Sequence, residues 1–233
     1  MTKEIQIRQR MLTTLLFASS GVGMLHEFIQ SQIASILWGG FVSKYLLTVG
    51  LYILSLGAGA AISQYFPKRT ESLALQQIAL GFLGLLLPFV SLLIGSRYTY
   101  NIGFSVMVIS VFVLGSISGM EFPLILELYE GKRQTKDDAT FMKLLGLDYV
   151  AMGIVTLIGP LIVAQVFGVL MAAFLASIVN CLMAIALLAL EKEVQRQSRI
   201  VLSSAAGVIV IFVVIGLGFR GDIENIFREW IVT

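Results

Sequence analysis

Charged residues are scarce in this sequence. Only 13% of its 233 residues are Asp, Glu, Lys or Arg, whereas a typical soluble domain carries roughly 25%. Hydrophobic residues make up 58% of the chain, and the mean hydropathy is +0.92. A water-soluble globule could not cover so much apolar surface, but helices in a bilayer can be apolar on their outer side as well. The composition therefore predicts a membrane protein.

Cysteine and histidine are nearly absent as well. Cys181 is the single cysteine, which excludes an intrachain disulfide and a cysteine metal cluster, and a lone histidine, His26, excludes a multi-histidine metal site. A net charge of +2 gives no reason to expect nucleic acid as a partner. The sequence contains no P-loop, dinucleotide-binding glycine motif or nucleophile elbow. We therefore expect no metal and no cofactor, and we do not expect this chain to be an enzyme.

Long apolar runs divide the chain into about seven predicted membrane spans. A hydrocarbon core of about 30 Å needs roughly 20 helical residues. Runs of suitable length cover residues 11–38, 45–66, 72–94, 101–128, 141–167, 169–190 and 200–219. We expect an all-α bundle over residues 1–219, with kinks at Pro123 and Pro160. Apolar residues recur at helical spacing in residues 220–233, which predicts a short interfacial tail.

The distribution of basic residues predicts the orientation. Twelve Lys and Arg lie before the first span or in the links after the second, fourth and sixth spans, and four lie on the other side. The positive-inside rule then puts the N-terminus in the cytoplasm, at the bacterial inner membrane, and the C-terminus outside. A re-entrant first segment is the alternative, and it would reverse this parity.

Four ionisable residues fall at membrane depth, where a charge costs about 2.5–3.5 kcal/mol on insertion scales. They are His26, Glu27, Glu121 and Asp148. One interpretation is a cation-binding site in a cavity between helices, suited to an amine or a proton. The other is a set of interhelical hydrogen bonds that hold the bundle together. Lys143 lies about a turn from Asp148, which favours an interfacial ion pair there, and His26 is better explained by packing or hydrogen bonding than by catalysis.

Two segments have similar local sequences. Residues 23–28 read Gly-Met-Leu-His-Glu-Phe, and residues 119–123 read Gly-Met-Glu-Phe-Pro. Three spans separate them, so the pattern is consistent with an inverted three-plus-three repeat. Six spans of this kind resemble half of a major-facilitator-type transporter.

Small residues indicate where helices pack closely. Gly57 and Gly59 lie in one small-residue run, and Gly115 and Gly119 are four residues apart in another. Such residues let helix backbones approach each other in lipid. Asn180, inside the sixth span, is expected to form a hydrogen bond between helices.

Several runs resemble the membrane domain at the N-terminus of certain bacterial polyamine aminopropyltransferases, the spermidine synthase-like proteins. They are residues 50–59 (GLYILSLGAG), 119–124 (GMEFPL), 147–151 (LDYVA) and 159–161 (GPL), together with Gly168 and Asn180. The first span departs from the family, which usually has a tyrosine before the glutamate where this sequence has His26 before Glu27.

The resemblance implies a function in which this chain is one part. In the fused relatives, a soluble domain after the last span holds decarboxylated S-adenosylmethionine and the diamine, and it transfers an aminopropyl group to putrescine. This sequence ends at Thr233, so we expect no catalytic or cofactor-binding residue in it. An outside C-terminus conflicts with a cytoplasmic synthase domain. Either the predicted orientation or the simple analogy with the fused relatives is therefore wrong.

Three functions remain open from the sequence. The first is a non-catalytic membrane module that acts as an anchor, a sensor or a polyamine-site subunit. Its partners would be membrane lipid and other proteins, such as a separately encoded aminopropyltransferase-like protein or further membrane subunits. The second is a small transporter or channel for amines or cations that works as a homo-oligomer. The third is an accessory structural subunit of a larger membrane complex.

Overall fold

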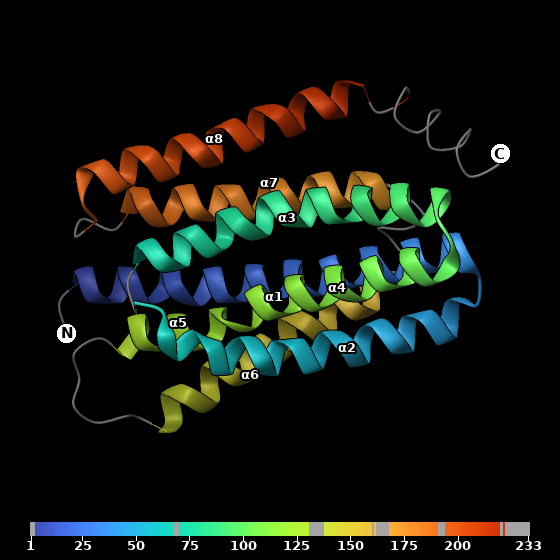
Figure 1. The fold of residues 1–233 in the computed structure, drawn as a ribbon. Coiled ribbons are helices and arrows are strands. Elements are labelled where there is room, and N and C mark those ends of the chain that lie inside the picture. The colour runs from blue at the N-terminus through green and yellow to red at the C-terminus, as the bar shows by residue number, and fades with distance from the viewer. Residues whose placement is uncertain are drawn as a thin grey trace.

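In the residues that the structure describes, the protein is an α-helical bundle (Figure 1) with seven helical spans long and apolar enough to cross a membrane. The structure is a computed structural model that describes residues 3–67, 70–130, 138–159, 161, 168–190, 194–219 and 221. No strand occurs in these residues. The all-α fold class predicted from the hydropathy is thus confirmed. Pro160 and nearly all of the predicted interfacial tail lie outside the described residues.

Each predicted span overlaps one helix or, for the fourth, a pair of consecutive helices, and most of the end of the fifth predicted span lies outside the described residues. The helices are α1 Lys3–Trp38, α2 Phe41–Ile62, α3 Thr70–Arg97, α4 Tyr100–Gly119, α5 Glu121–Glu130, α6 Asp138–Ile158, α7 Val169–Leu190 and α8 Arg196–Gly218. A 3-10 turn, Ser63–Tyr65, follows α2. Helices α4 and α5 together form one span. The first helix begins well before the predicted span because its charged N-terminal turns continue the helix beyond the apolar run.

Glycine makes the turn between α1 and α2. Gly39 and Gly40 have φ angles of 67° and 66°, in the left-handed region that favours glycine. Two successive residues of this kind end α1 and let α2 return beside it. The long first apolar run therefore contains one complete span and not a re-entrant segment.

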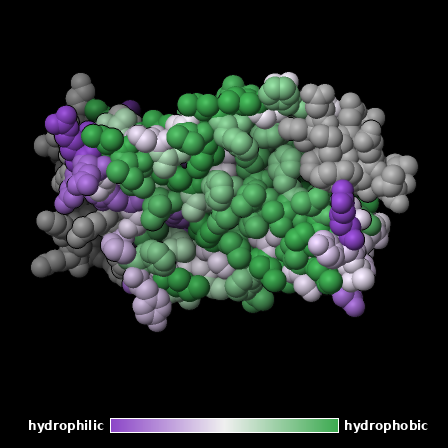
Figure 2. Space-filling view, turned by 45° about the horizontal axis from the view of Figure 1, so that its top comes forward, coloured by the Kyte–Doolittle hydropathy of each residue, from purple (hydrophilic) through white to green (hydrophobic). Residues whose placement is uncertain are grey.

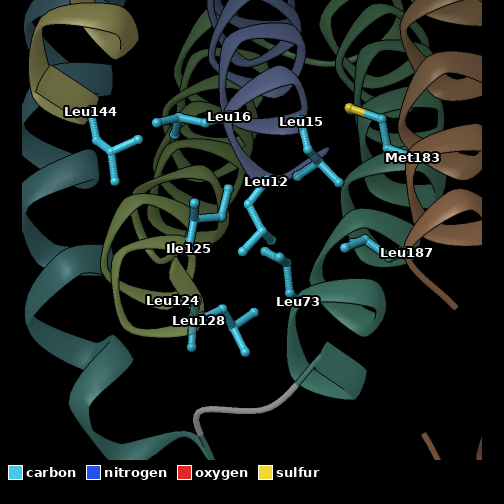
Figure 3. Close-up of a cluster of buried hydrophobic side chains, with 10 residues drawn as sticks. All are labelled: Leu12, Leu15, Leu16, Leu73, Leu124, Ile125, Leu128, Leu144, Met183 and Leu187. Atoms are coloured by element: carbon cyan, nitrogen blue, oxygen red, sulfur yellow. The ribbon is translucent and has the colours of Figure 1, made fainter. Parts of the chain in front are cut away.

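Helix α1 is the most buried span and lies at the centre of the bundle. At the end near its N-terminus, leucines from α1 meet apolar side chains from four other helices, and they point toward one another in Figure 3. The cluster consists of Leu12, Leu15, Leu16, Leu73, Leu124, Ile125, Leu128, Leu144, Met183 and Leu187. Helices α2, α6 and α8 are more exposed. Figure 2 shows a broad hydrophobic belt with hydrophilic residues toward the two ends, as a bilayer-spanning bundle requires.

The packing order agrees with the predicted repeat. Helix α1 packs on α6 and α7, while α4 packs on α2 and α3. In the predicted repeat, α1 corresponds to the span of α4 and α5, α2 to α6, and α3 to α7. The contact of α1 with α6 then corresponds to that of α4 with α2, and the contact of α1 with α7 to that of α4 with α3. Consecutive triplets of spans cross the bundle in opposite directions, so the relation would be an inverted one. Superposition of the two halves remains a prediction.

Aromatic residues gather at the end of the bundle where α1 turns into α2. The rings of Trp38, Tyr100 and Phe104 lie with centroids 5.5–5.9 Å apart. The Lys44 ammonium lies 5.4 Å from the centroids of Tyr100 and Phe104, and it donates to the Tyr100 hydroxyl at 3.2 Å. Aromatic rings and a lysine head at one helix end are typical of the membrane–water interface.

Candidate functional site

A cavity of about 620 Å³ lies inside the bundle, between α2 and α6, with α1, α4 and α5 also contributing to its lining. Exposed residues on both flanking helices line it, among them Ile53 and Gly57 on α2 and Tyr149 and Gly153 on α6. These residues lie well within the membrane-spanning segments. The cavity therefore opens sideways, toward the lipid.

A break between α4 and α5 positions one carboxyl group in this cavity. Pro123 is the third residue of α5, and its ring nitrogen cannot donate to the carbonyl of Gly119, four residues earlier. Helix α4 accordingly ends at Gly119, and α5 begins at Glu121. The predicted kink thus lies at Met120, where the two helices meet within one span, and Glu121 is the first residue of α5.

Two neighbouring helices hold Glu121 in place. The Ser19 hydroxyl of α1 donates to Oε1 of Glu121, and the Gln77 amide of α3 donates to the same oxygen at 3.1 Å. The side chain is only 4% exposed, yet it lines the cavity. Glu121 thus links three helices, and its hydrogen bonds fix one of its oxygens.

Asp148 reaches the same cavity from α6. The Ser20 hydroxyl of α1 donates to its Oδ1. Asp148 lies close enough to Glu121 for the two carboxyl groups to interact electrostatically. The sequence favoured an ion pair with Lys143, but Lys143 lies instead with Gln9 and Arg10 at the end of the bundle. The expectation was wrong because the carboxyl group turns inward, toward α1.

Hydroxyl groups extend the polar lining along α1. A Cβ added to Gly23 would fall 2.9 Å from the Tyr52 hydroxyl and 3.5 Å from the Ser118 hydroxyl, so both hydroxyls lie over this glycine. Tyr52 is 1% exposed, and it lies close enough to Glu27, Glu121 and Asp148 to interact electrostatically with all three carboxyl groups. These hydroxyls could not be predicted from the sequence, because serine and tyrosine carry no charge that marks them as costly in lipid.

Glu27 lies one turn farther along α1, outside the cavity lining. Thr48 of α2 donates to its Oε1 at 2.9 Å, whereas its Oε2 has no hydrogen-bond partner among the described residues. The side chain is 1% exposed. Ser20, Gly23 and Glu27 are spaced by three and four residues and share one face of the helix. Glu27 therefore lies at the far end of the row of polar groups that begins at Ser20, beyond the residues that line the cavity.

His26 faces a different part of the bundle. Its Nε2 lies 2.9 Å from the side-chain nitrogen of Asn180 on α7, and its ring fills the space over Gly84 on α3. His26 and Asn180 are both buried. Adjacent helix residues point about 100° apart, so His26 contacts α3 and α7 while Glu27 contacts α2. Three of the four predicted site residues thus lie along one row, and His26 does not join them.

Glycines bring α2 and α4 into close contact. A Cβ on Gly59 would collide with the Ser116 backbone, one on Gly115 with the Ser55 side chain, and one on Gly119 with the Leu56 backbone. Gly57 differs from the expectation for a packing residue, because no atom lies within 4 Å of its Cβ position and it lines the cavity. Residues two apart on a helix point to nearly opposite sides, so Gly57 and Gly59 cannot both face α4.

The lining favours a cation. No Lys, Arg or His belongs to the described residues that line the cavity, so Glu121 and Asp148 have no basic partner there. In a water-poor site, an uncompensated carboxylate attracts positive charge strongly. The aromatic faces of Tyr45, Tyr52 and Phe122 can also receive an alkylammonium group. Within the described part of the chain, no group of three His, Cys, Asp or Glu side chains is placed to hold a metal ion.

Fold and cavity together define a polytopic helical membrane protein with an acidic internal site. The chain is 28% identical over 213 residues to a polyamine aminopropyltransferase of Leptospira interrogans, covering 90% of this chain and 41% of that protein. It is 25% identical over 180 residues to polyamine aminopropyltransferase 2 of Ralstonia nicotianae, covering 75% of this chain and 34% of that protein. A polyamine aminopropyltransferase of Oceanobacillus iheyensis is 24% identical over 243 residues, covering 98% of this chain and 45% of the relative.

The chain thus spans less than half the length of these curated relatives. No protein-family model matches the chain, and no solved structure matches it. The predicted resemblance to polyamine aminopropyltransferases is confirmed at low identity over most of the chain.

Proposed function

We propose that this chain is a non-catalytic membrane module of a polyamine-related system and that its cavity binds a polyamine. The observation that carries the proposal is the pair of carboxyl groups, Glu121 and Asp148, in a cavity whose described lining contains no basic side chain. The names of the similar proteins supply the class of cation. Apolar lining residues such as Leu56 and Met152 suit the methylene segments between the amino groups.

The module binds its ligand and does not transfer the aminopropyl group. The similarity extends over 90% of this chain but 41% of the Leptospira protein, so the larger part of that relative has no counterpart in these 233 residues. In our proposal, an aminopropyltransferase-like partner performs the transfer named for the relatives, and this module anchors it or reports polyamine to it. Affinity purification in mild detergent from the native host, with mass spectrometry, tests this assignment. Recovery of the chain alone would contradict it.

The proposed location is the bacterial inner membrane, with the N-terminus in the cytoplasm. The excess of Lys and Arg at the end of the bundle where α1 begins supports this orientation. The lateral opening between α2 and α6 then lies within the bilayer. A ligand passes between the lipid-facing sides of these two helices to reach the carboxyl groups.

Equilibrium binding of radiolabelled spermidine to the full chain in lipid nanodiscs tests the polyamine site. We expect saturable binding that falls at least tenfold in the double variant Glu121→Gln, Asp148→Asn, because the substitutions keep the shape and remove the charge. Glu71→Gln is the matched control, since Glu71 lies in the first turn of α3 and does not line the cavity. Absence of binding by the unaltered chain, or equal binding by the double variant, would refute the site.

Transport of amines is the second candidate function. The pairing of α1 with α6 and α7, matched by that of α4 with α2 and α3, is the observation that favours it, because inverted repeats are common among transporters. Flux of labelled spermidine into proteoliposomes above that of empty vesicles would support transport. Saturable binding without flux would leave the module as the better description.

A further inference from the structure

Buried polar atoms without partners extend the candidate site beyond the cavity. Gln30 is 0% exposed, and neither its Oε1 nor its Nε2 has a hydrogen-bond partner among the described residues. Oε2 of Glu27 also has no hydrogen-bond partner among the described residues, and the Glu27 side chain is 1% exposed. Burial of a polar atom without a hydrogen-bond partner is unfavourable. An occupant with polar hydrogens would remove this cost.

The two side chains lie together on α1. Gly23, Glu27, Gln30 and Ala34 recur at spacings of three and four residues, which is one face of the helix. Gly23 lies under Tyr52, and Ala34 packs in a cluster with Tyr52 as well. Gln30 therefore belongs to the face that meets α2 and α4. Helical side chains lean toward the N-terminus of their own helix, which directs Gln30 toward Glu27.

This buried pair continues the row of polar groups that lines the cavity. The row begins where Ser20 holds Asp148, passes the hydroxyls of Tyr52 and Ser118 over Gly23, and ends at Glu27. Ser20 and Glu27 are seven residues apart on α1, a rise of about 10 Å. Tyr45, Val49 and Tyr52 of α2 line the cavity, and Thr48 of the same helix holds Glu27. Helices α1 and α2 therefore bound the row at both of its ends.

We infer that the site is elongated and selects a linear triamine over shorter amines, an inference that rests on the proposed polyamine binding. One terminal ammonium group lies between Glu121 and Asp148, and the opposite one lies at Glu27 and Gln30. An ammonium group has three donors, and Oε2 of Glu27 and Oε1 of Gln30 are acceptors with no other partner in the described chain. The Tyr52 and Ser118 hydroxyls receive the middle amine.

Charge favours three amino groups over one. Glu27, Glu121 and Asp148 bring three carboxyl groups to the row, and a buried charge without a counter-charge is strongly destabilising. A triamine can compensate all three carboxylates, whereas a monoamine compensates one. The number of amino groups, and not hydrophobicity alone, then determines affinity.

A series of amines with one, two and three amino groups tests this inference on the full chain in nanodiscs. Butylamine, putrescine and spermidine are measured in competition with labelled spermidine, and we expect the affinity to rise at each step. Glu27→Gln should weaken spermidine about tenfold, a loss of 1.4 kcal/mol, and leave butylamine within about twofold. Gln30→Met, a substitution of similar shape, should weaken spermidine in the same selective way. Retained butylamine binding also establishes that each variant is folded.

The outcomes separate the two proposals. If spermidine binds no more tightly than butylamine, or if Glu27→Gln weakens every amine equally, the elongated site is wrong while the amine site at Glu121 and Asp148 stands. If none of the three amines binds to the unaltered chain, the polyamine site itself is wrong, and the elongated site is overturned with it.

Discussion

The contact between α2 and α4 predicts opposite effects for two alanine substitutions in small-residue runs. A Cβ on Gly119 would collide with the carbonyl oxygen, carbonyl carbon and Cα of Leu56, all of them backbone atoms. No rotamer change can relieve that collision, so α2 must move away from α4. Gly57 has no atom within 4 Å of its Cβ position. Gly119→Ala should therefore be destabilising, and Gly57→Ala should be tolerated.

The size of the difference follows from these surroundings. Overpacking costs typically about 1–3 kcal/mol, and a collision with backbone belongs near the upper end of that range. Gly119 is the last residue of α4, so alanine gains little helix propensity there. Gly57 lies inside α2, where replacement of glycine by alanine contributes up to about 1 kcal/mol. We expect the two variants to differ by about 3–4 kcal/mol in free energy of unfolding.

Thermal unfolding in one detergent, followed by circular dichroism and by size exclusion after heating, measures this difference. A shift of about 2–4 °C per kcal/mol for a chain of this length gives a gap on the order of 10 °C between the two midpoints. Both variants add the same methyl group, so detergent and expression effects are matched. Equal midpoints, or a lower midpoint for Gly57→Ala, would refute the close contact at Gly119.

Three further predictions concern other parts of the fold. Asn180→Leu should lower the free energy of unfolding by about 1–3 kcal/mol, because Nε2 of His26 loses its buried partner; an unchanged melting midpoint would contradict the contact. Gly57→Cys, in a cysteine-free background, should react with a lipid-permeant maleimide and react more slowly with spermidine present, since this position lines the cavity; identical rates would speak against occupancy by the polyamine. A cysteine at Ser43 should be labelled from outside intact cells, and one at Gln195 only after permeabilisation; the reverse pattern would show that the N-terminus is outside.

The spans and their order could be predicted from the sequence because the bilayer imposes a strong constraint on length and hydropathy. The seven runs correspond to the seven spans, and the Gly39-Gly40 pair marks the first turn. Acidic residues at membrane depth could be found for the same reason, since each is costly in lipid. Pro123 predicted a kink in the fourth span. That α4 would end at Gly119 and that Glu121 would be the first residue of α5 could not be predicted.

Partners across helices could not be read from the chain. Ser19 and Ser20 bond to Glu121 and Asp148, which lie 102 and 128 residues away, and serine carries no distinctive signal. Gln30 was missed because an uncharged amide in an apolar run is inconspicuous. The separation of His26 from Glu27 follows from helix geometry alone, yet only tertiary packing determines which helix each one meets.

Photocrosslinking with a spermidine analogue that carries a photoreactive group on its alkyl chain tests the polyamine site most directly. The full chain is labelled in native membranes and its peptides are mapped by mass spectrometry. The proposed site predicts adducts on residues 16–24 of α1, 45–60 of α2 and 145–156 of α6, which spermidine suppresses and the double variant Glu121→Gln, Asp148→Asn abolishes. Adducts confined to other segments, or unchanged in the double variant, would contradict a polyamine site in this cavity.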